Sequence, residues 1–352
     1  MVKRAGLQGS VSSRGAPGST RRWLSLPMLL AAILCGACTP IVEDGEVLEL
    51  GEQDELVGRS GTIAMAPGSG VEVRAGGALI LRGSRVTGGA LRRGDPSGIL
   101  PQSAITEGAP GIRVEGGTLL AQAREVSGGP TVVDLDFVDP PLMDSGPAFI
   151  TPVTGGSAIV ATDAVVEIDS GGFFGGLPDG PTLAWPSDAL RIERSTLQIR
   201  GGGFVGGNFA ADRSDPILQL GRSLVANRSR IEISGGVFFD LVQLDDSIST
   251  IRGGQFGAIR VGGAVSADDP PGCLELAGGS LRELGVFGNE TAILVGSGFD
   301  RPLGPLEDSG ILLSGTLSDG SILNGVRVFQ GASAHIVLAA PGTSSCTALS
   351  AE

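Results

Sequence analysis

The side chains available for chemistry are few, and they exclude several kinds of active site. His335 is the only histidine, Lys3 is the only lysine, and the sequence has no tyrosine. A Schiff-base lysine, a P-loop lysine and a zinc site with several histidines are therefore excluded beyond the first few residues. His335 alternates with apolar neighbours from Ala334 to Leu338, and this pattern predicts an exposed residue of an ordinary strand.

Carboxylates remain as candidates for acid–base chemistry. Two carboxylic acids suffice for glycoside hydrolysis, and the adjacent pair Asp245 and Asp246 comes nearest to such an arrangement. A second group of acids is compatible with calcium binding, but the same alternation is typical of a solvated strand face: Asp134, Asp136, Asp139 and Asp144. We therefore predict no catalytic residue, no metal site and no cofactor.

The distribution of charge separates the amino terminus from the rest of the chain. Four arginines and Lys3 precede residue 38, whereas every acidic residue follows it. The formal net charge is −13, and the segment from residue 38 onward is more acidic still. Such a surface repels phosphate backbones, so we expect no nucleic-acid partner.

The amino terminus predicts export. Residues 1–22 are basic and polar, an apolar run of about a dozen residues follows, and small residues precede Cys38. These are the parts of a secretory signal peptide over residues 1–37, and the run is too short to span a bilayer. The alternatives of general or twin-arginine export stay open, the second because of the pair Arg21 and Arg22.

Gly36 and Ala37 before Cys38 resemble the lipobox of bacterial lipoproteins, although Cys35 stands where leucine is usual. The resemblance implies that Cys38 is acylated and becomes the mature amino terminus. It also implies an outer-membrane lipoprotein of the bacterial envelope, because Thr39 rather than aspartate follows the cysteine. Plain cleavage without lipidation is the alternative.

The remaining cysteines and the acidic stretch complete the predictions for the ends of the chain. Residues 38–58 carry seven acidic residues and are predicted to be an acidic tether. With Cys35 removed and Cys38 acylated, Cys273 and Cys346 remain, and an oxidising compartment favours one disulfide between them. Two separate free thiols are the alternative.

The body of the chain is a repeat. An aliphatic residue, two small residues and then Phe or Leu recur in a fixed pattern, and several copies follow an alternating strand. The copies end at Phe173, Phe204, Phe238, Phe256, Leu281 and Phe299, with weaker ones at Leu91 and Leu119. From Phe173 the spacings are 31, 34, 18, 25 and 18 residues, so a unit near 18 residues carries insertions.

This spacing predicts an all-β protein, a single-stranded parallel β-solenoid (β-helix) over residues 59–299. Insertions that leave the motif intact suit a solenoid, because each coil contacts only its neighbours. The glycine pairs allow positive φ at a corner, and the following Phe or Leu is predicted to point inward. Stacked coils then place these side chains in a buried ladder with a step of about 4.8 Å. An antiparallel β-sandwich is the alternative fold.

These repeats resemble the right-handed parallel β-helix proteins of bacterial envelopes, the superfamily that contains pectate lyases and polygalacturonases. The resemblance implies Asp or Arg chemistry, yet the histidine and Arg-x-Lys elements of the hydrolases have no counterpart. Lyases use an arginine base, but no motif selects one of the candidates: Arg191, Arg194, Arg200 and Arg252.

The last part of the chain differs from the repeats. Residues 300–340 are predicted to be a C-terminal β cap, with a hairpin that turns at Asp319 and Gly320. Residues 341–352 form a tail. We therefore expect a monomeric, lipid-anchored surface protein with a structural, adhesive or interaction role, bound to the membrane and to a cell-surface polysaccharide or protein. A polysaccharide lyase or glycoside hydrolase is the alternative.

Overall fold

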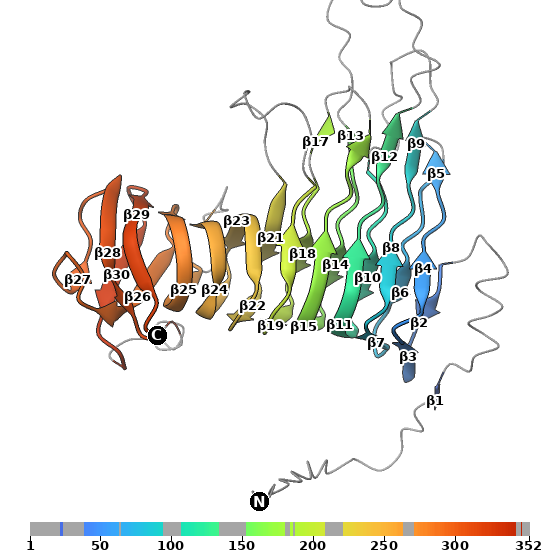
Figure 1. Cartoon of the computed structure of the whole chain (residues 1–352), viewed down its shortest axis with the longest axis horizontal. Coiled ribbons are helices and arrows are strands. Elements are labelled where there is room, and N and C mark those ends of the chain that lie inside the picture. Colours follow the sequence, from blue (N-terminus) through green and yellow to red (C-terminus); the bar gives the residue numbers. More distant parts are fainter. Residues whose placement is uncertain are drawn as a thin grey trace, which may run out of the picture.

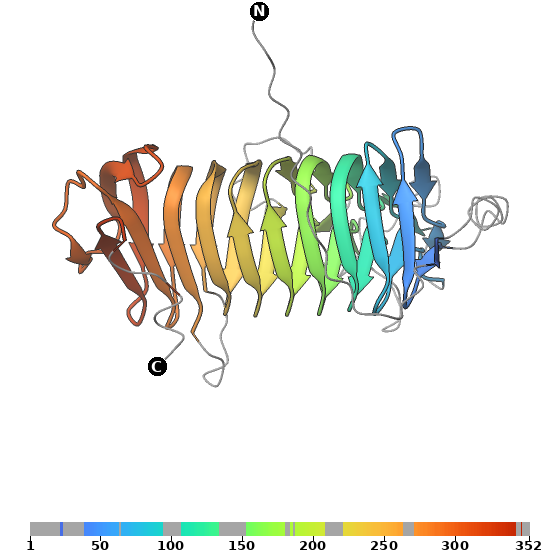
Figure 2. The same cartoon turned by 90° about the horizontal axis from the view of Figure 1, so that it is seen from below.

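The computed structural model describes residues 22–23, 39–62, 65–93, 107–133, 153–179, 184–185, 187–207, 221–262, 271–342 and 346. Strands dominate these residues, so the prediction of an all-β protein is confirmed. Twenty-four of the described strands belong to one sheet, and almost all of its pairings are parallel. Figures 1 and 2 show an elongated molecule in which strands follow one another in chain order from the blue end to the red end.

The pairings arrange these strands in three rows. The first row contains β2 (Ile41–Val42), β6 (Val71–Val73), β10 (Ile112–Glu115), β14 (Ile159–Thr162), β18 (Leu190–Glu193) and β21 (Arg222–Asn227). It continues through the second half of β23 (Val237–Asp245) and the last parts of β24 (Ile248–Val261) and β25 (Cys273–Val286).

The second row contains the alternating strands of the repeat. It begins with β1 (Arg22–Trp23), β3 (Glu46–Leu50), β7 (Ala78–Arg82), β11 (Thr118–Ser127) and β15 (Val165–Phe174). It goes on through β19 (Thr196–Ile199), β22 (Arg230–Ile233), the starts of β24 and β25, and β26 (Thr291–Ser297). Each apolar residue of one strand lies beside that of the next, as Ile199 does beside Ile233.

The third row carries the predicted ladder. It contains β4 (Glu55–Val57), β8 (Arg85–Thr87), the ends of β11 and β15, β20 (Gly203–Val205), and short parts of β23, β24 and β25. Phe173, Phe204, Phe238 and Phe256 are buried, and adjacent rings stack with centroids 4.6 to 5.1 Å apart. Leu281 continues the ladder beside Phe256, so the prediction of a buried ladder is confirmed for these five positions.

The prediction that the two weaker copies of the motif place Leu91 and Leu119 in the ladder is wrong. Val86 and Val126, not Leu91 and Leu119, precede Phe173 in the third row. Leu119 belongs to the second row, and Leu91 lies in a separate sheet. The error has a physical cause: glycine pairs also occupy the other corners of the chain, so the same letters mark more than one bend. Phe299 also lies outside the ladder and packs against Gly315.

Glycines connect the three rows to two smaller sheets that extend outward from them. The outgoing strands β5 (Gly61–Thr62), β9 (Leu91–Arg93), β12 (Thr131–Val133) and β16 (Pro178–Asp179) pair with one another, as do β13 (Val153–Thr154) and β17 (Ala184–Trp185). At their base the amide of Gly156 donates to the Gly129 carbonyl at 2.8 Å. A Cβ on Gly128 would lie 1.7 Å from the Gly156 oxygen, so no larger residue fits there.

The segment expected to be an acidic tether differs from that prediction. Its residues Ile41–Val42, Glu46–Leu50 and Glu55–Val57 form β2, β3 and β4, which pair with β6, β7 and β8. Its acids alternate with the buried side chains of Val42, Leu48, Leu50 and Leu56, and this burial favours a strand over an extended linker.

The C-terminal module extends the rows and adds antiparallel strands. β27 (Gly304–Pro305), β28 (Ile311–Leu317), β29 (Ile322–Gln330) and β30 (His335–Ala339) lie between residues 300 and 340. β28 and β29 pair antiparallel, so the predicted hairpin is confirmed, while β29 and β30 also pair in parallel with β25 and β26. His335 is exposed in β30, as predicted.

A disulfide ties the tail to β25, the strand that precedes this module. Cys273 and Cys346 are bonded, with their Cα atoms 5.6 Å apart and a sequence separation of 73 positions. Both cysteines are buried in a small cluster with Ile293, Val295 and Ala339. The predicted disulfide is therefore confirmed.

Candidate functional site

A row of glycines runs beside the Phe ladder. Each lies two residues before a ladder side chain and has a φ between 94° and 129°: Gly171, Gly202, Gly236, Gly254 and Gly279. Residues with a side chain rarely adopt this conformation, so the glycines are needed for the bend. Because they carry no side chain, the surface outside the ladder is hollow along the row.

The hollow forms an open groove of about 570 Å³. Its floor is backbone, and its polar side chains come from β24, β25 and the β28–β29 turn. The lining residues are Gly202, Gly235, Gly236, Val237, Gly254, Gln255, Gly279, Ser280, Asp319 and Ser321. The groove therefore crosses successive coils, and it ends against the C-terminal module.

Asp319 occupies that end of the groove. Its carboxylate accepts hydrogen bonds from the Gly279 amide at 3.0 Å and from the Ser321 hydroxyl at 2.7 Å. Burial opposes ionisation, but the hydrogen bonds from Ser321 and Gly279 prevail and hold the pKa of Asp319 below its usual value. The turn is thus bound to the glycine row through the ionised carboxylate of Asp319.

Charged side chains flank the groove on the second row. Arg200 bonds to Asp169 at 2.5 Å and to Glu167 at 3.1 Å, and Gln122 donates to Asp169 at 3.0 Å. The hydrogen bonds from Gln122 and Arg200 lower the pKa of Asp169. Arg252 lies 3.7 Å from Glu232 farther along the same face. These acids are paired with arginines, an arrangement that suits binding rather than proton transfer.

A second polar network lies on the first row, centred on Asp188. This residue is only 2% exposed, and Arg222 holds both of its oxygens at 2.8 and 3.1 Å. Arg191 approaches the same carboxylate at 3.3 Å and Glu107 at 3.6 Å. Asp188 is thus held between two arginines in a buried ion-pair network.

The network continues to the predicted carboxylate pair. Arg222 donates to Gln243 at 2.8 Å, and Gln243 donates to Asp245 at 2.7 Å. Burial raises the pKa of Asp245, and the charge of Asp246 adds to this effect while the hydrogen bond from Gln243 opposes it. Asp246, in contrast, turns toward Glu290, whose carboxylate accepts its amide N–H at 3.3 Å. The two aspartates therefore belong to different contacts.

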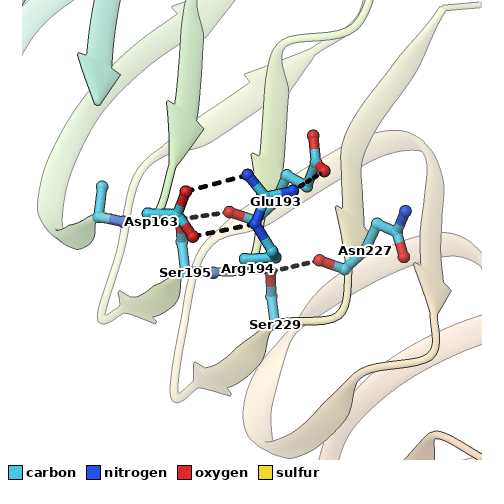
Figure 3. Close-up of polar contacts among 7 residues, drawn as sticks. Asp163, Glu193, Arg194, Ser195, Asn227 and Ser229 are labelled. Atoms are coloured by element: carbon cyan, nitrogen blue, oxygen red, sulfur yellow. Dashed lines mark hydrogen bonds and ion pairs between the residues drawn. The ribbon is translucent and has the colours of Figure 1, made fainter. Parts of the chain in front are cut away.

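Arg194 is placed at a corner of the chain (Figure 3). Its guanidinium bonds to both oxygens of Asp163, at 3.0 and 2.9 Å, and also to Glu193. Behind it, the Ser195 amide donates to Ser229 Oγ at 3.1 Å, and Ser229 Oγ donates to the Asn227 carbonyl at 2.7 Å. The same bonds recur between Ser229 and Ser247, so the serines form a structural ladder.

The four candidate arginines do not form one site. Arg191 lies in the Asp188 network, Arg194 lies at the corner, and Arg200 and Arg252 flank the groove. No motif in the sequence points to Asp188, Arg222 or Glu290, and Asp319 was predicted only as part of a turn. One signal was available for the first two: they are 34 residues apart, the separation of Phe204 and Phe238, and so they occupy adjacent coils.

Other predictions lie outside the described residues. These include lipidation of Cys38, the signal peptide apart from Arg22–Trp23, and the acids at positions 134, 136, 139 and 144. Within the described ranges no group of three His, Cys, Asp or Glu residues is placed to hold a metal ion. The described part of the chain also has no helix long and apolar enough to cross a membrane.

Comparison of the chain with protein-family models, with curated proteins and with solved structures found no match.

Proposed function

We propose that this protein is an exported, lipid-anchored module of the bacterial cell envelope that binds an elongated partner and is not catalytic. Its body is a single-stranded parallel β-solenoid closed by a C-terminal β cap. Cys38 carries the lipid, which attaches the chain to the outer membrane. The protein acts as a monomer and does not bind nucleic acid.

The observation that carries the proposal is the groove beside the Phe ladder. Its backbone floor spans several coils, so a linear cell-surface polymer can approach closely along its length. The charged side chains beside it are paired, as in the contacts of Arg200 with Glu167 and Asp169. These features favour an adhesive role, with a polysaccharide as the first candidate partner and a protein as the second.

Binding is tested with the full-length protein on a panel of immobilised polysaccharides, with retention and depolymerisation scored separately. Gln255→Trp fills the groove, whereas the matched variant Thr250→Trp lies on the same strand outside its lining. We expect retention that Gln255→Trp abolishes and Thr250→Trp preserves. Equal retention of both variants on the polysaccharide would show that the groove is not the binding site.

Anchoring is tested through Cys38. Cys38→Ala should move the protein from the detergent phase to the soluble envelope fraction, because the acylated sulfur is lost. Unchanged partitioning into detergent would reject the lipoprotein assignment.

The alternative function is a polysaccharide lyase or glycoside hydrolase. It is favoured by one observation, the raised pKa of Asp245 at the end of a network that contains two arginines. Release of reducing ends or unsaturated products, abolished by Asp245→Asn, would establish the enzyme and overturn the binding module.

A further inference from the structure

Two phenylalanine side chains are exposed on the outer surface of the third row. Phe174 ends β15 and is 39% exposed, and Phe239 in β23 is 63% exposed. Each directly follows a buried ladder residue, Phe173 or Phe238. Successive side chains of a strand point to opposite faces, so both rings point outward. Their burial would have stabilised the fold, and the core therefore does not account for these two rings.

Glycines surround both rings. A Cβ on Gly172 would lie 2.6 Å from a carbon of the Phe174 ring, so this ring lies directly over Gly172. A Cβ on Gly203 would lie 4.0 Å from the Phe239 ring. On the other side, Gly257 packs against the backbone of Phe239 and has no side chain that could cover the ring. The two rings therefore lie low on the surface and are open to solvent.

The rings are continuous with the groove. Gly172 pairs with Gly203, and Gly203 pairs with Val237 in the next coil. Val237 pairs with Gln255, and Gln255 pairs with Ser280, and all three of these residues line the groove. One column of outward-facing positions thus runs from the exposed phenylalanines into the groove. The rings lie at the end of the groove that is opposite the C-terminal module.

The charges along this surface are few and have partners within the protein. Among the residues that line the groove only Asp319 is charged, and the amide of Gly279 and the hydroxyl of Ser321 bond to its carboxylate. Beside the rings, Asp240 accepts the Gly206 amide at 2.9 Å, and in the preceding coil Glu125 lies 3.2 Å from an arginine, Arg85. The net charge of −13 repels an anionic polymer, and the surface offers a cationic polymer no acid without a partner. The electrostatics therefore favour an uncharged partner.

We propose that the surface from Phe174 to Ser321 binds a linear polysaccharide of uncharged sugars, whose rings stack on Phe174 and Phe239. A pyranose has an apolar C–H face, which suits the face of an aromatic ring, and hydroxyl groups at its edge. Gln255 and Ser280 supply polar side chains along the groove for those hydroxyl groups. The inference rests on the proposed function, and it narrows the partner to one chemical class.

Titration calorimetry of the full-length protein tests the inference. The probes are β-1,4-linked hexamers of glucose, mannose and xylose, and charged hexamers of galacturonate and of glucosamine. We expect an uncharged hexamer to bind, with an affinity that changes less than about twofold between about 0.05 and 0.5 M salt. Phe174→Ala and Phe239→Ala should each weaken this binding by about tenfold, whereas Phe239→Trp should keep it because an aromatic face remains. Leu312→Ala is the matched control, since Leu312 is 59% exposed in β28 and lies outside the groove lining.

The outcomes separate this inference from the proposed function. Unchanged affinity in Phe174→Ala and Phe239→Ala, with retention still abolished by Gln255→Trp, would overturn the inference and leave the groove as the binding site. Binding of the charged hexamers alone would do the same. Self-association that Phe239→Ala abolishes, without sugar binding, would assign the surface to a second copy of the chain. Failure of the wild-type protein to bind any polysaccharide would reject the proposed function, and the inference with it.

Discussion

The carboxylate of Asp319, in the turn between β28 and β29, accepts a hydrogen bond of 3.0 Å from the amide of Gly279 in the last coil. The Asp319 amide in turn donates to the Ala277 carbonyl at 3.1 Å, so the contact is made in both directions. The glycine row thereby ends in a contact with the C-terminal module. A residue with a side chain at Gly278 would displace this turn, because its Cβ would lie 2.3 Å from Asp319 Oδ2.

Asp319→Asn should destabilise the module in a pH-dependent way. Because the folded-state pKa of Asp319 is lowered, its carboxylate contributes stability above the ordinary aspartate value of about 3.9 and loses it as the pH falls through the folded value. Denaturant unfolding should show a deficit at pH 7 that shrinks at pH 3. The exposed Asp308→Asn is the matched control, and an equal deficit at both pH values would contradict the prediction.

Phe238→Ala should destabilise the protein by about 3–5 kcal/mol, the usual cost of truncating a buried aromatic side chain. Its ring stacks between Phe204 and Phe256, with centroids 4.6 and 4.8 Å away. The next residue, Phe239, is 63% exposed, and Phe239→Ala should cost less than about 1 kcal/mol. Chemical denaturation of both variants checks this, and similar losses would mean that the two faces of the strand are misassigned.

Ser229→Ala removes a step of the serine ladder. The hydroxyl accepts the Ser195 amide at 3.1 Å and donates to the Asn227 carbonyl, so its loss leaves a buried donor and an acceptor unpaired. We expect a loss of about 1–3 kcal/mol. Ser234→Ala is the control, because Ser234 is exposed and its hydroxyl makes one long bond of 3.4 Å. No difference between the two would show that the ladder does not stabilise the corner.

The ladder from Phe173 to Phe256 was predictable from sequence because one glycine-rich motif precedes each of its aromatic residues, and these lie in one row. The early coils were not, because Val86 and Val126 fill the ladder there and glycine pairs mark other bends. Strands β2 to β4 were missed because their acids dominate the composition, although buried aliphatic residues alternate with them.

The contacts of the candidate site depend on the register between neighbouring strands, which cannot be read from the amino-acid composition. Asp163 and Arg194 are 31 residues apart, as are Phe173 and Phe204, so one coil length would have paired them. The contact between Asp319 and Gly279 could not be predicted in this way, because Asp319 lies in a hairpin outside the repeat and no repeat length relates the two residues. Glu290 was hidden for the same reason, since its burial depends on how the module packs on the last coil.

The disulfide should stabilise the C-terminal module. Cys273 begins β25 and Cys346 lies in the tail, so their bond closes a loop that contains the whole C-terminal module. A bond across a sequence separation of 73 lowers the conformational entropy of the unfolded chain. The chain-entropy model gives a stabilisation of roughly 4 kcal/mol for a loop of this length.

Removal of this bond should therefore affect the module more than the early coils. Cys346→Ser should speed hydrogen exchange in β28 and β29 and leave β10 and β14 near their wild-type rates, since those strands lie several coils away. Thiol counting of the denatured, non-reduced protein from the envelope should find neither Cys273 nor Cys346 free. Two titratable thiols, or an equal increase in exchange along the whole body, would show that the tail does not hold the module in place.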